Sequence, residues 1–320
     1  MKLISITLAV LALCALSSCN NSAEIGAAAQ PVQAGSKLVV FVIDGPRATE
    51  LWDDTTHAQM PHMWNDLRPQ GTLFTNFRND GLTLTNPGHA SIMTGTWQTV
   101  DNQGNTRPDR PTLFEYYRAA TGAPMSDTWV VSGKSKLYVC SHGTDPDYGA
   151  VYGASERVGF ATDMAVYDAL MDVLADEKPH VVLACFPQVD LKGHSGVWQD
   201  YLDAIANVDS LLWKTWNSLQ ADPFYEGQTT LLVTADHGRH DDAHGGFQHH
   251  GDDCEGCRRL FCLALGPDVR QGETVALVYD QRDVCSTCGE VLEVPVPKAE
   301  GRVMEDMFEV PTGVREKPAR

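Results

Sequence analysis

Five continuous apolar runs recur along the chain and predict strands that are buried on both faces of a sheet. They occupy residues 37–45, 128–133, 180–187, 229–236 and 260–267. Unbroken runs of this kind are typical of parallel sheets, because helices cover both faces of such a sheet. We therefore expect the five runs to be neighbours in one sheet.

Helical patterns lie between these runs. Apolar residues recur at helical spacing from Met164 to Leu174 and again from Trp198 to Leu219. Strands that alternate with helices predict an α/β fold with an open, mostly parallel sheet and helices on both faces. We expect a single domain with loop insertions. The segments 97–127 and 138–161 are expected to be these loops or small lid insertions.

The beginning of the chain has the composition of a targeting segment. Lys2 precedes an apolar run, from Ile4 to Leu16, that is too short to span a bilayer as a stable helix. Residues 1–18 are expected to be a lipoprotein signal peptide, with Cys19 as the lipidated residue, because Leu16–Cys19 resembles a bacterial lipobox. An ordinary signal peptide cut nearby is the alternative.

Residues 19–36 are small, polar and non-periodic, so they predict a flexible tether before a catalytic domain over residues 37–320. The expected location is the periplasmic side of a bacterial membrane, with the protein anchored by its lipid, and Asn20 is compatible with the outer membrane. The oligomeric state is left open.

The formal net charge of −18 excludes a general nucleic-acid binder, because such binding depends on basic residues opposite phosphates. Removal of residues 1–18 takes away one positive charge, that of Lys2, and changes the net charge to −19. An acidic protein can still act on phosphate esters where metal ions supply positive charge locally.

The stretch TLTNPGHA, residues 83–90, predicts a sharp turn that leads into a helix. Pro87 suits the first position of that helix, so Thr85 is expected just before it. Backbone amides at a helix start favour an anion, which suits an oxygen nucleophile that attacks phosphorus or sulfur. The alternative is a threonine that merely caps the helix.

Carboxylates and histidines follow the predicted strands at the edge where ligands bind in open α/β sheets. Asp44 and Asp236 end two strands, and Asp190 follows a third. Gathered carboxylates would repel one another, so a bound cation is expected, and carboxylate with imidazole suits catalytic zinc. The nearby histidines are His194, His237, His240, His244, His249 and His250.

The order of these motifs resembles the alkaline phosphatase superfamily over nearly all of residues 37–310. The closest parts are its type I phosphodiesterase/nucleotide pyrophosphatase and phosphate-monoesterase branches. The resemblance implies two zinc ions per chain. It places one zinc at Asp44, Thr85, Asp236 and His237. It places the other at Asp190, His194 and His250, with His249 as the alternative to His250.

The resemblance also suggests residues that bind the phosphoryl oxygens. Asn102 matches the family's phosphate-binding asparagine, although Asn105 is an alternative. Lys134 and Lys136 resemble a pair of cations found in some periplasmic monoesterases. Two cations would suit a dianionic monoester, but a solvated surface is the competing interpretation for both lysines.

The expected function is a two-zinc phosphoric ester hydrolase that acts through a phosphothreonine on small-molecule phosphate esters, as a phosphomonoesterase or as a phosphodiesterase. This chain has Thr-Asn-Pro-Gly-His where family phosphodiesterases often have Thr-Phe-Pro-Asn-His. The Cys-x-Pro-x-Arg motif of formylglycine sulfatases is absent. The alternatives are a phosphotransferase for envelope glycan or lipid headgroups, a sulfatase-like hydrolase without formylglycine, and a non-catalytic metal-binding lipoprotein.

Two C-x-x-C pairs stand in the C-terminal third, Cys254/Cys257 and Cys285/Cys288. An oxidising compartment favours disulfides, whereas a metal site built from all four thiolates is the alternative. Cys185 and Cys262 lie within apolar runs and are expected to be buried thiols.

Overall fold

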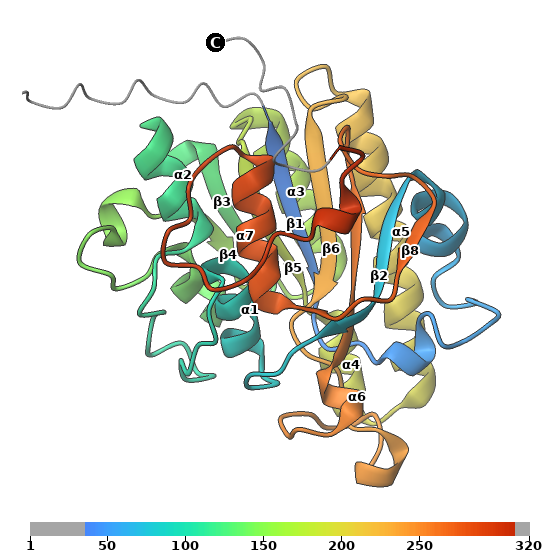
Figure 1. Cartoon of the computed structure of the whole chain (residues 1–320). Coiled ribbons are helices and arrows are strands. Elements are labelled where there is room, and N and C mark those ends of the chain that lie inside the picture. Colours follow the sequence, from blue (N-terminus) through green and yellow to red (C-terminus); the bar gives the residue numbers. More distant parts are fainter. Residues whose placement is uncertain (1–35, 311–320) are drawn as a thin grey trace, which may run out of the picture. The chain divides into compact units, whose positions relative to one another are not determined.

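Nine strands form a single sheet in the computed structural model, which describes residues 36–310 (Figure 1). The order is β4-β3-β5-β1-β6-β7-β2-β8, and β9 also pairs with β2. The strands are β1 (Lys37–Ile43), β2 (Gly71–Arg78), β3 (Thr128–Ser132), β4 (Ser155–Val158), β5 (Val181–Phe186), β6 (Thr229–Ala235), β7 (Arg259–Leu265), β8 (Glu273–Val275) and β9 (Tyr279–Asp280).

The sheet is mostly parallel, as the sequence predicts. Of the strands in the described region, β7 runs antiparallel to both of its neighbours, β6 and β2, and every other pairing is parallel. β1 lies between β5 and β6, with Ile43 paired to Phe186 and to Ala235. This register brings the residues that follow β1, β5 and β6 to one edge of the sheet.

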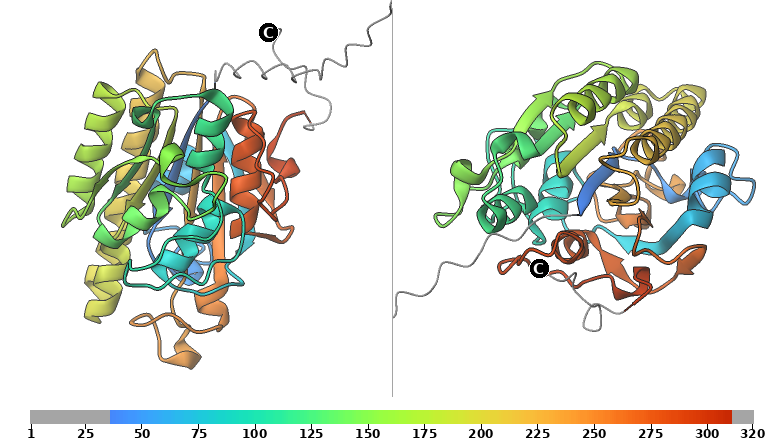
Figure 2. Two further views of the ribbon diagram at one scale, coloured as in Figure 1. Left: turned by 90° about the vertical axis from the view of Figure 1, so that its left-hand side faces the viewer. Right: turned by 90° about the horizontal axis from the view of Figure 1, so that it is seen from above.

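Helices cover both faces of the sheet. Figure 2 shows α3 and α5 on one side and α1, α2 and α7 on the other. The helices are α1 (Thr85–Thr94), α2 (Leu113–Thr121), α3 (Asp163–Asp176), α4 (Gln188–Ser195), α5 (Trp198–Ala221), α6 (Glu255–Arg258) and α7 (Gln281–Val291). At the carboxyl edge of the sheet, α1, α4 and α6 lie close to the strand ends (Figure 1).

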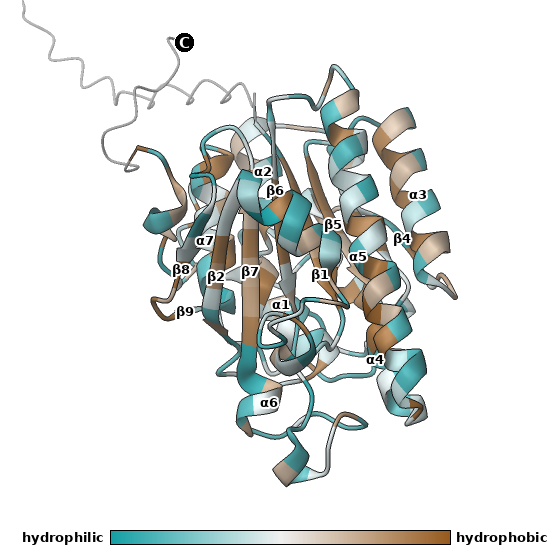
Figure 3. Ribbon diagram, turned by 90° about the vertical axis from the view of Figure 1, so that its right-hand side faces the viewer, coloured by the Kyte–Doolittle hydropathy of each residue, from teal (hydrophilic) through white to brown (hydrophobic). Residues whose placement is uncertain are grey.

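The central strands are mainly apolar, while α3 and α5 alternate between apolar and polar faces (Figure 3). All seven residues of β1 are buried, and Phe41 stacks on Phe186 with ring centroids 4.1 Å apart. Unbroken apolar runs form strands here because both faces of the sheet are covered. The five predicted strands and the two predicted helices are therefore confirmed.

Three sequence predictions need correction. The segment 97–127 contains α2, which Thr112 and Glu115 begin with a reciprocal capping box. The segment 138–161 contains the edge strand β4. Helix α1 already begins at Thr85, which makes Pro87 its third residue rather than its first.

The predicted signal peptide, the lipid site at Cys19 and the tether up to residue 35 lie outside the described residues, and so do residues 311–320. Among the helices of residues 36–310, none has the length and apolar character needed to cross a bilayer. All described residues belong to one compact unit.

Candidate hydrolytic site

Two aspartates meet in the buried centre of the site. Asp44 follows β1, Asp236 follows β6, and both are fully buried. Neither oxygen of Asp44 has a hydrogen-bond partner, and Asp236 Oδ2 has none either. Lys134 Nζ and His89 Nδ1 each lie 3.3 Å from one of these carboxylates. Burial of a carboxylate nevertheless costs on the order of several kcal/mol, and these oxygens accept no hydrogen bond that would offset it. The chemistry of this donor set therefore fits a bound cation.

His237 links these aspartates to a second cluster. Its Nε2 lies 3.4 Å from Asp44 Oδ1 and 3.5 Å from Asp236 Oδ2, and it too is buried without a hydrogen-bond partner. Its ring stacks on that of His250 with centroids 3.8 Å apart. Ligand atoms of Asp44, Asp236 and His237 lie within 4.8 Å of one another, and so do those of Asp190, His237 and His250.

The second cluster is built from α4 and the loop between β6 and β7. Asp190 and His194 stand one turn apart on α4, with Asp190 Oδ1 3.2 Å from His194 Nε2. His250 Nε2 lies 3.4 Å from the same carboxylate oxygen and 3.2 Å from His194 Nε2. Burial opposes ionisation of Asp190, but hydrogen bonds from both histidines outweigh it and lower the pKa of this carboxyl.

The structure distinguishes between the two neighbouring histidines of the loop. His250 has a side chain that is 7% exposed, and its Nδ1 lies 3.0 Å from the carbonyl oxygen of Thr83. His249 is exposed and contributes its carbonyl oxygen to the amide of His240. His250, rather than His249, thus belongs to the cluster.

Thr85 lies beside the first cluster and does not cap its helix. The N-cap of α1 is Leu84, which has no side-chain capping bond, and Thr85 is the first helical residue and 1% exposed. His89 connects it to the aspartates, because His89 Nδ1 lies 2.9 Å from the Thr85 carbonyl oxygen and 3.3 Å from Asp236 Oδ2. Gly88 allows α1 to approach this closely, since a Cβ there would lie 2.3 Å from the Asp236 carbonyl oxygen.

The two lysines belong to the site and are not solvated surface groups. Lys134 Nζ lies 2.6 Å from Asp190 Oδ2 and 3.3 Å from Asp44 Oδ2. Burial would lower the pKa of Lys134, but these two carboxylates raise it above its ordinary value. Lys136 donates to Asn102 Oδ1 at 2.9 Å, and burial followed by the charge of Lys134 lowers its pKa.

Asn102 lies at the start of α1. Its Oδ1 accepts hydrogen bonds from the Asn86 amide at 3.0 Å and from Lys136. Asn105 is exposed and donates both its amide and its side-chain nitrogen to Asp101, so it belongs to a surface turn. The structure therefore brings Asn102 into the site and leaves Asn105 outside it.

Two residues of the site escape sequence reasoning. His89 is the histidine of the Pro-Gly-His stretch, but its position between Thr85 and Asp236 depends on the packing of α1 against β6. Arg239 is fully buried, and its Nη1 donates to Asp190 Oδ1 at 2.6 Å. The sequence feature that could have indicated Arg239 is its position two residues after His237, a predicted metal ligand.

The predicted disulfides are not formed, and the seven described cysteines are all free thiols. Cys285 and Cys288 lie inside α7 and are fully buried in the core, whereas Cys254 and Cys257 lie at α6. The pairs occupy separate elements, and the groups of potential ligands in the described region do not combine them. The prediction of a site with four thiolates is therefore wrong.

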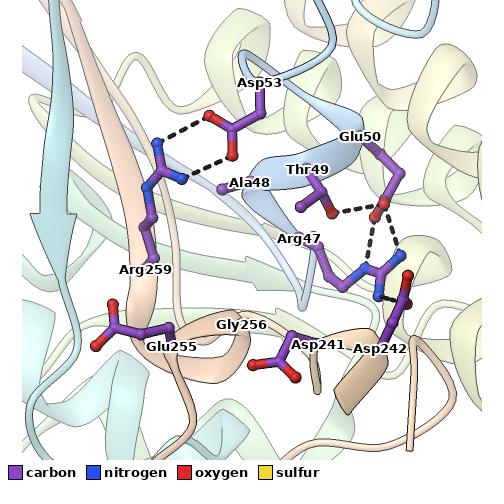
Figure 4. A pocket seen from close by; sticks show the side chains of 10 residues that line it. All are labelled: Arg47, Ala48, Thr49, Glu50, Asp53, Asp241, Asp242, Glu255, Gly256 and Arg259. Carbon is purple, nitrogen blue, oxygen red and sulfur yellow. Dashed lines mark hydrogen bonds and ion pairs between the residues drawn. The ribbon is translucent and has the colours of Figure 1, made fainter. Parts of the chain in front are cut away.

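A separate hollow of about 330 Å³ lies near the start of the β6–β7 loop (Figure 4). Its two arginines are already neutralised, since Arg47 pairs with Glu50 and Asp242, and Arg259 pairs with Asp53. The remaining charged residues of its lining are acidic. Such a lining would repel a phosphate ester, so we place the chemistry at the buried clusters.

Comparison with known proteins identifies the family and agrees with this fold. The model of the family described as type I phosphodiesterase/nucleotide pyrophosphatase matches residues 38–243. The chain therefore belongs to this family, within the alkaline phosphatase superfamily. A segment of 73 residues is 37% identical to a 2,3-bisphosphoglycerate-independent phosphoglycerate mutase of Clostridium perfringens, and it spans 23% of this chain and 13% of the mutase.

Solved structures share the fold at low sequence identity. A 2-O GAG sulfatase is 14% identical with a TM-score of 0.66, over 89% of this chain and 76% of that one. Murine ectonucleotide pyrophosphatase/phosphodiesterase 5 is 14% identical with a TM-score of 0.63, over 85% of this chain and 100% of that one. A phosphonate monoester hydrolase from Silicibacter pomeroyi is 15% identical with a TM-score of 0.60, over 89% of this chain and 78% of that one.

Proposed function

We propose that this protein hydrolyses phosphate esters with two zinc ions and with Thr85 as the nucleophile. The observation that carries the proposal is the group of fully buried acceptor atoms on Asp44, Asp236 and His237 that make no hydrogen bond, next to the start of α1. A purely structural site would have paired these atoms, because unsatisfied buried polar groups are rare in native proteins.

The residues divide into two ligand sets. Asp44, Thr85, Asp236 and His237 would hold one zinc ion. Asp190, His194 and His250 would hold the other. Two zinc ions held there would supply positive charge to the attacking and leaving oxygens of an in-line displacement.

The chain's own residues then bind and orient the ester. The hydroxyl oxygen of Thr85 attacks phosphorus, a new oxygen–phosphorus bond forms, and the bond to the leaving alcohol breaks. The leaving alcohol takes up the proton that the Thr85 hydroxyl loses. Water then attacks the phosphothreonine, which releases phosphate from a monoester substrate or a phosphate monoester from a diester, and a proton of that water restores the threonine hydroxyl. Because Asn102 Oδ1 is occupied by two donors, its side-chain NH₂ group would face a non-bridging oxygen together with Lys136.

Removal and return of metal test the proposed function. Protein treated with a chelator should lose its activity on aryl phosphate monoesters and diesters, and it should regain that activity when zinc is added. The variant Lys136→Met should lose more activity on the dianionic monoester than on the diester, whereas Lys214→Met, at an exposed position of α5, should match the wild type. Full activity in metal-free protein would contradict the proposal.

A further inference from the structure

Four metal-ligand side chains converge in the loop between β6 and β7, outside the hydrolytic site. His240, Asp252 and Cys257 form one group of potential ligands, and the thiol of Cys254 joins it through a hydrogen bond to Asp252. His240 Nε2 lies 3.2 Å from Asp252 Oδ2, and ligand atoms of His240, Asp252 and Cys257 lie within 4.8 Å of one another. His240 Nε2 is buried, and its approach to Asp252 Oδ2 lacks hydrogen-bond geometry, so the carboxylate lies beside the imidazole without being aligned to it.

The two thiols complete the cluster. Cys254 is the N-cap of α6, Cys257 follows three residues later, and both are buried. The thiols of both cysteines lie within hydrogen-bond reach of the Asp252 carboxylate. The Cys254 amide donates to Asp252 Oδ1 at 3.0 Å, which fixes that carboxylate beside the sulfurs.

The backbone around the cluster is built tightly. Gly256, the second residue between the two cysteines, lies against the chain at 239–241, because a Cβ there would be 2.4 Å from the Arg239 carbonyl oxygen and 2.5 Å from the Asp241 amide. The Gly251 amide provides a hydrogen bond to the Cys257 sulfur and so fixes its position. Only glycine at position 256 lets the C-x-x-C turn approach His240.

We propose that His240, Asp252, Cys254 and Cys257 bind a structural zinc ion that is separate from the hydrolytic pair. Two cysteines spaced C-x₂-C with one histidine and one carboxylate provide four ligands for a tetrahedral site, and structural zinc sites are typically closed in this way. A disulfide between Cys254 and Cys257 would not explain why the His240 imidazole and the Asp252 carboxylate both lie beside the Cys257 sulfur.

This zinc site would hold a ligand of the hydrolytic site in place. The His240 amide donates to the His249 carbonyl oxygen at 2.8 Å, and His240 and Asp252 flank His250 in the loop. A metal ion bound by both His240 and Asp252 would close the loop around His250 and reduce the conformational freedom of the His250 side chain. The effect on His250 rests on the proposed function, whereas the existence of the zinc site does not.

Cobalt substitution of the purified full chain tests the proposal. The hydrolytic ligands are all oxygen or nitrogen, so a sulfur-to-cobalt charge-transfer band in the near ultraviolet would report only the proposed site. The wild type should show this band, and the double variant Cys254→Ser/Cys257→Ser should lose it. The matched control Cys285→Ala/Cys288→Ala, which removes the other C-x-x-C pair, should keep it.

A second variant keeps the test decisive if the double serine variant does not fold. His240→Gln retains both thiols and should bind cobalt at this site at least about tenfold more weakly in competition with a chelator. His244 forms the competing group of potential ligands with Asp241 and Cys254, and its imidazole pairs with Asp241 at 2.7 Å. If the assignment to His240 is correct, His244→Gln should bind cobalt normally. Loss of affinity in His244→Gln but not in His240→Gln would overturn the ligand assignment.

Absence of the band in the wild type would overturn the proposal. A disulfide would overturn it as well, and mass spectrometry would detect one as a mass lower by two hydrogens on the unreduced peptide that contains Cys254 and Cys257. A cobalt protein that shows the band but hydrolyses no phosphate ester would refute the proposed function and leave the structural site standing.

Discussion

Single residues show the difference between a buried charge that the fold has satisfied and one that needs a ligand. Asp209 is fully buried in α5, but it accepts hydrogen bonds from the amides of His62 at 2.9 Å and Met63 at 2.7 Å. Asp44 is equally buried, but neither of its oxygens accepts a hydrogen bond, and Lys134 Nζ faces it at 3.3 Å. Sequence shows an aspartate in each place, and only the structure shows which one requires a cation.

The buried carboxyl of Asp163 predicts how the stability of the protein depends on pH. Its Oδ1 accepts a hydrogen bond from the Gln188 amide at 3.0 Å, whereas its Oδ2 is buried without a hydrogen bond. Burial, and to a smaller extent the charge of Asp44, raises the pKa of Asp163 to about 7. The folded pKa lies above the unfolded one, so the stability linked to this group is complete below about pH 4 and is lost as the pH rises to about 7.

We therefore expect Asp163→Asn to be more stable than the wild type at pH 8, on the order of a few kcal/mol, with the gain disappearing near pH 4. Denaturant unfolding at several pH values measures this difference. Asp172→Asn, at a largely exposed position of the same helix, should show no such trend. An equal gain for Asp163→Asn at pH 4 and pH 8 would refute the explanation.

At the scale of elements, apolar periodicity predicts what lies in the core and misses what lies at the edges. The five buried strands are unbroken apolar runs, whereas β4 has no fully buried residue and β8 is three residues long. Neither edge strand has a face that must be apolar, so its sequence carries little signal. The capping box of α2 was readable at Thr112 and Glu115, but the surrounding prolines and glycines hid it.

The contact of α1 with the end of β6 also belongs to this scale. Gly88→Ala would place a methyl group against the Asp236 carbonyl oxygen and push α1 away from the aspartates. We expect at least a hundredfold loss of phosphoesterase activity, since a displacement of about 1 Å at a catalytic site can cost that much.

Gly122→Ala is the matched control. Gly122 ends α2 with a φ of +73°, and a Cβ there meets nothing within 4 Å. The variant should lose about 1 kcal/mol of stability and retain its activity. Activity assays and unfolding curves of both variants measure the two effects, and similar activities would show that the close approach of α1 is not required.

At the scale of the whole molecule, the site joins residues that lie up to about two hundred positions apart, from Asp44 to His250. Parallel strands place their carboxyl ends at one edge, so the sequence already predicts that Asp44, Asp190 and Asp236 meet. It cannot predict that Arg239 contacts Asp190, because that contact depends on how the long β6–β7 loop folds back.

The central claim is that Thr85 becomes covalently phosphorylated, and acid quenching of the zinc-loaded enzyme during turnover of an aryl phosphate tests it most directly. Mass spectrometry should find a phosphoryl group on the peptide that contains Thr85, with none on Thr85→Ala and a smaller amount on Thr85→Ser. Thr85→Ala should also keep its fold and metal content while losing several orders of magnitude in rate. An unmodified Thr85 peptide, together with near wild-type hydrolysis by Thr85→Ala, would contradict the account.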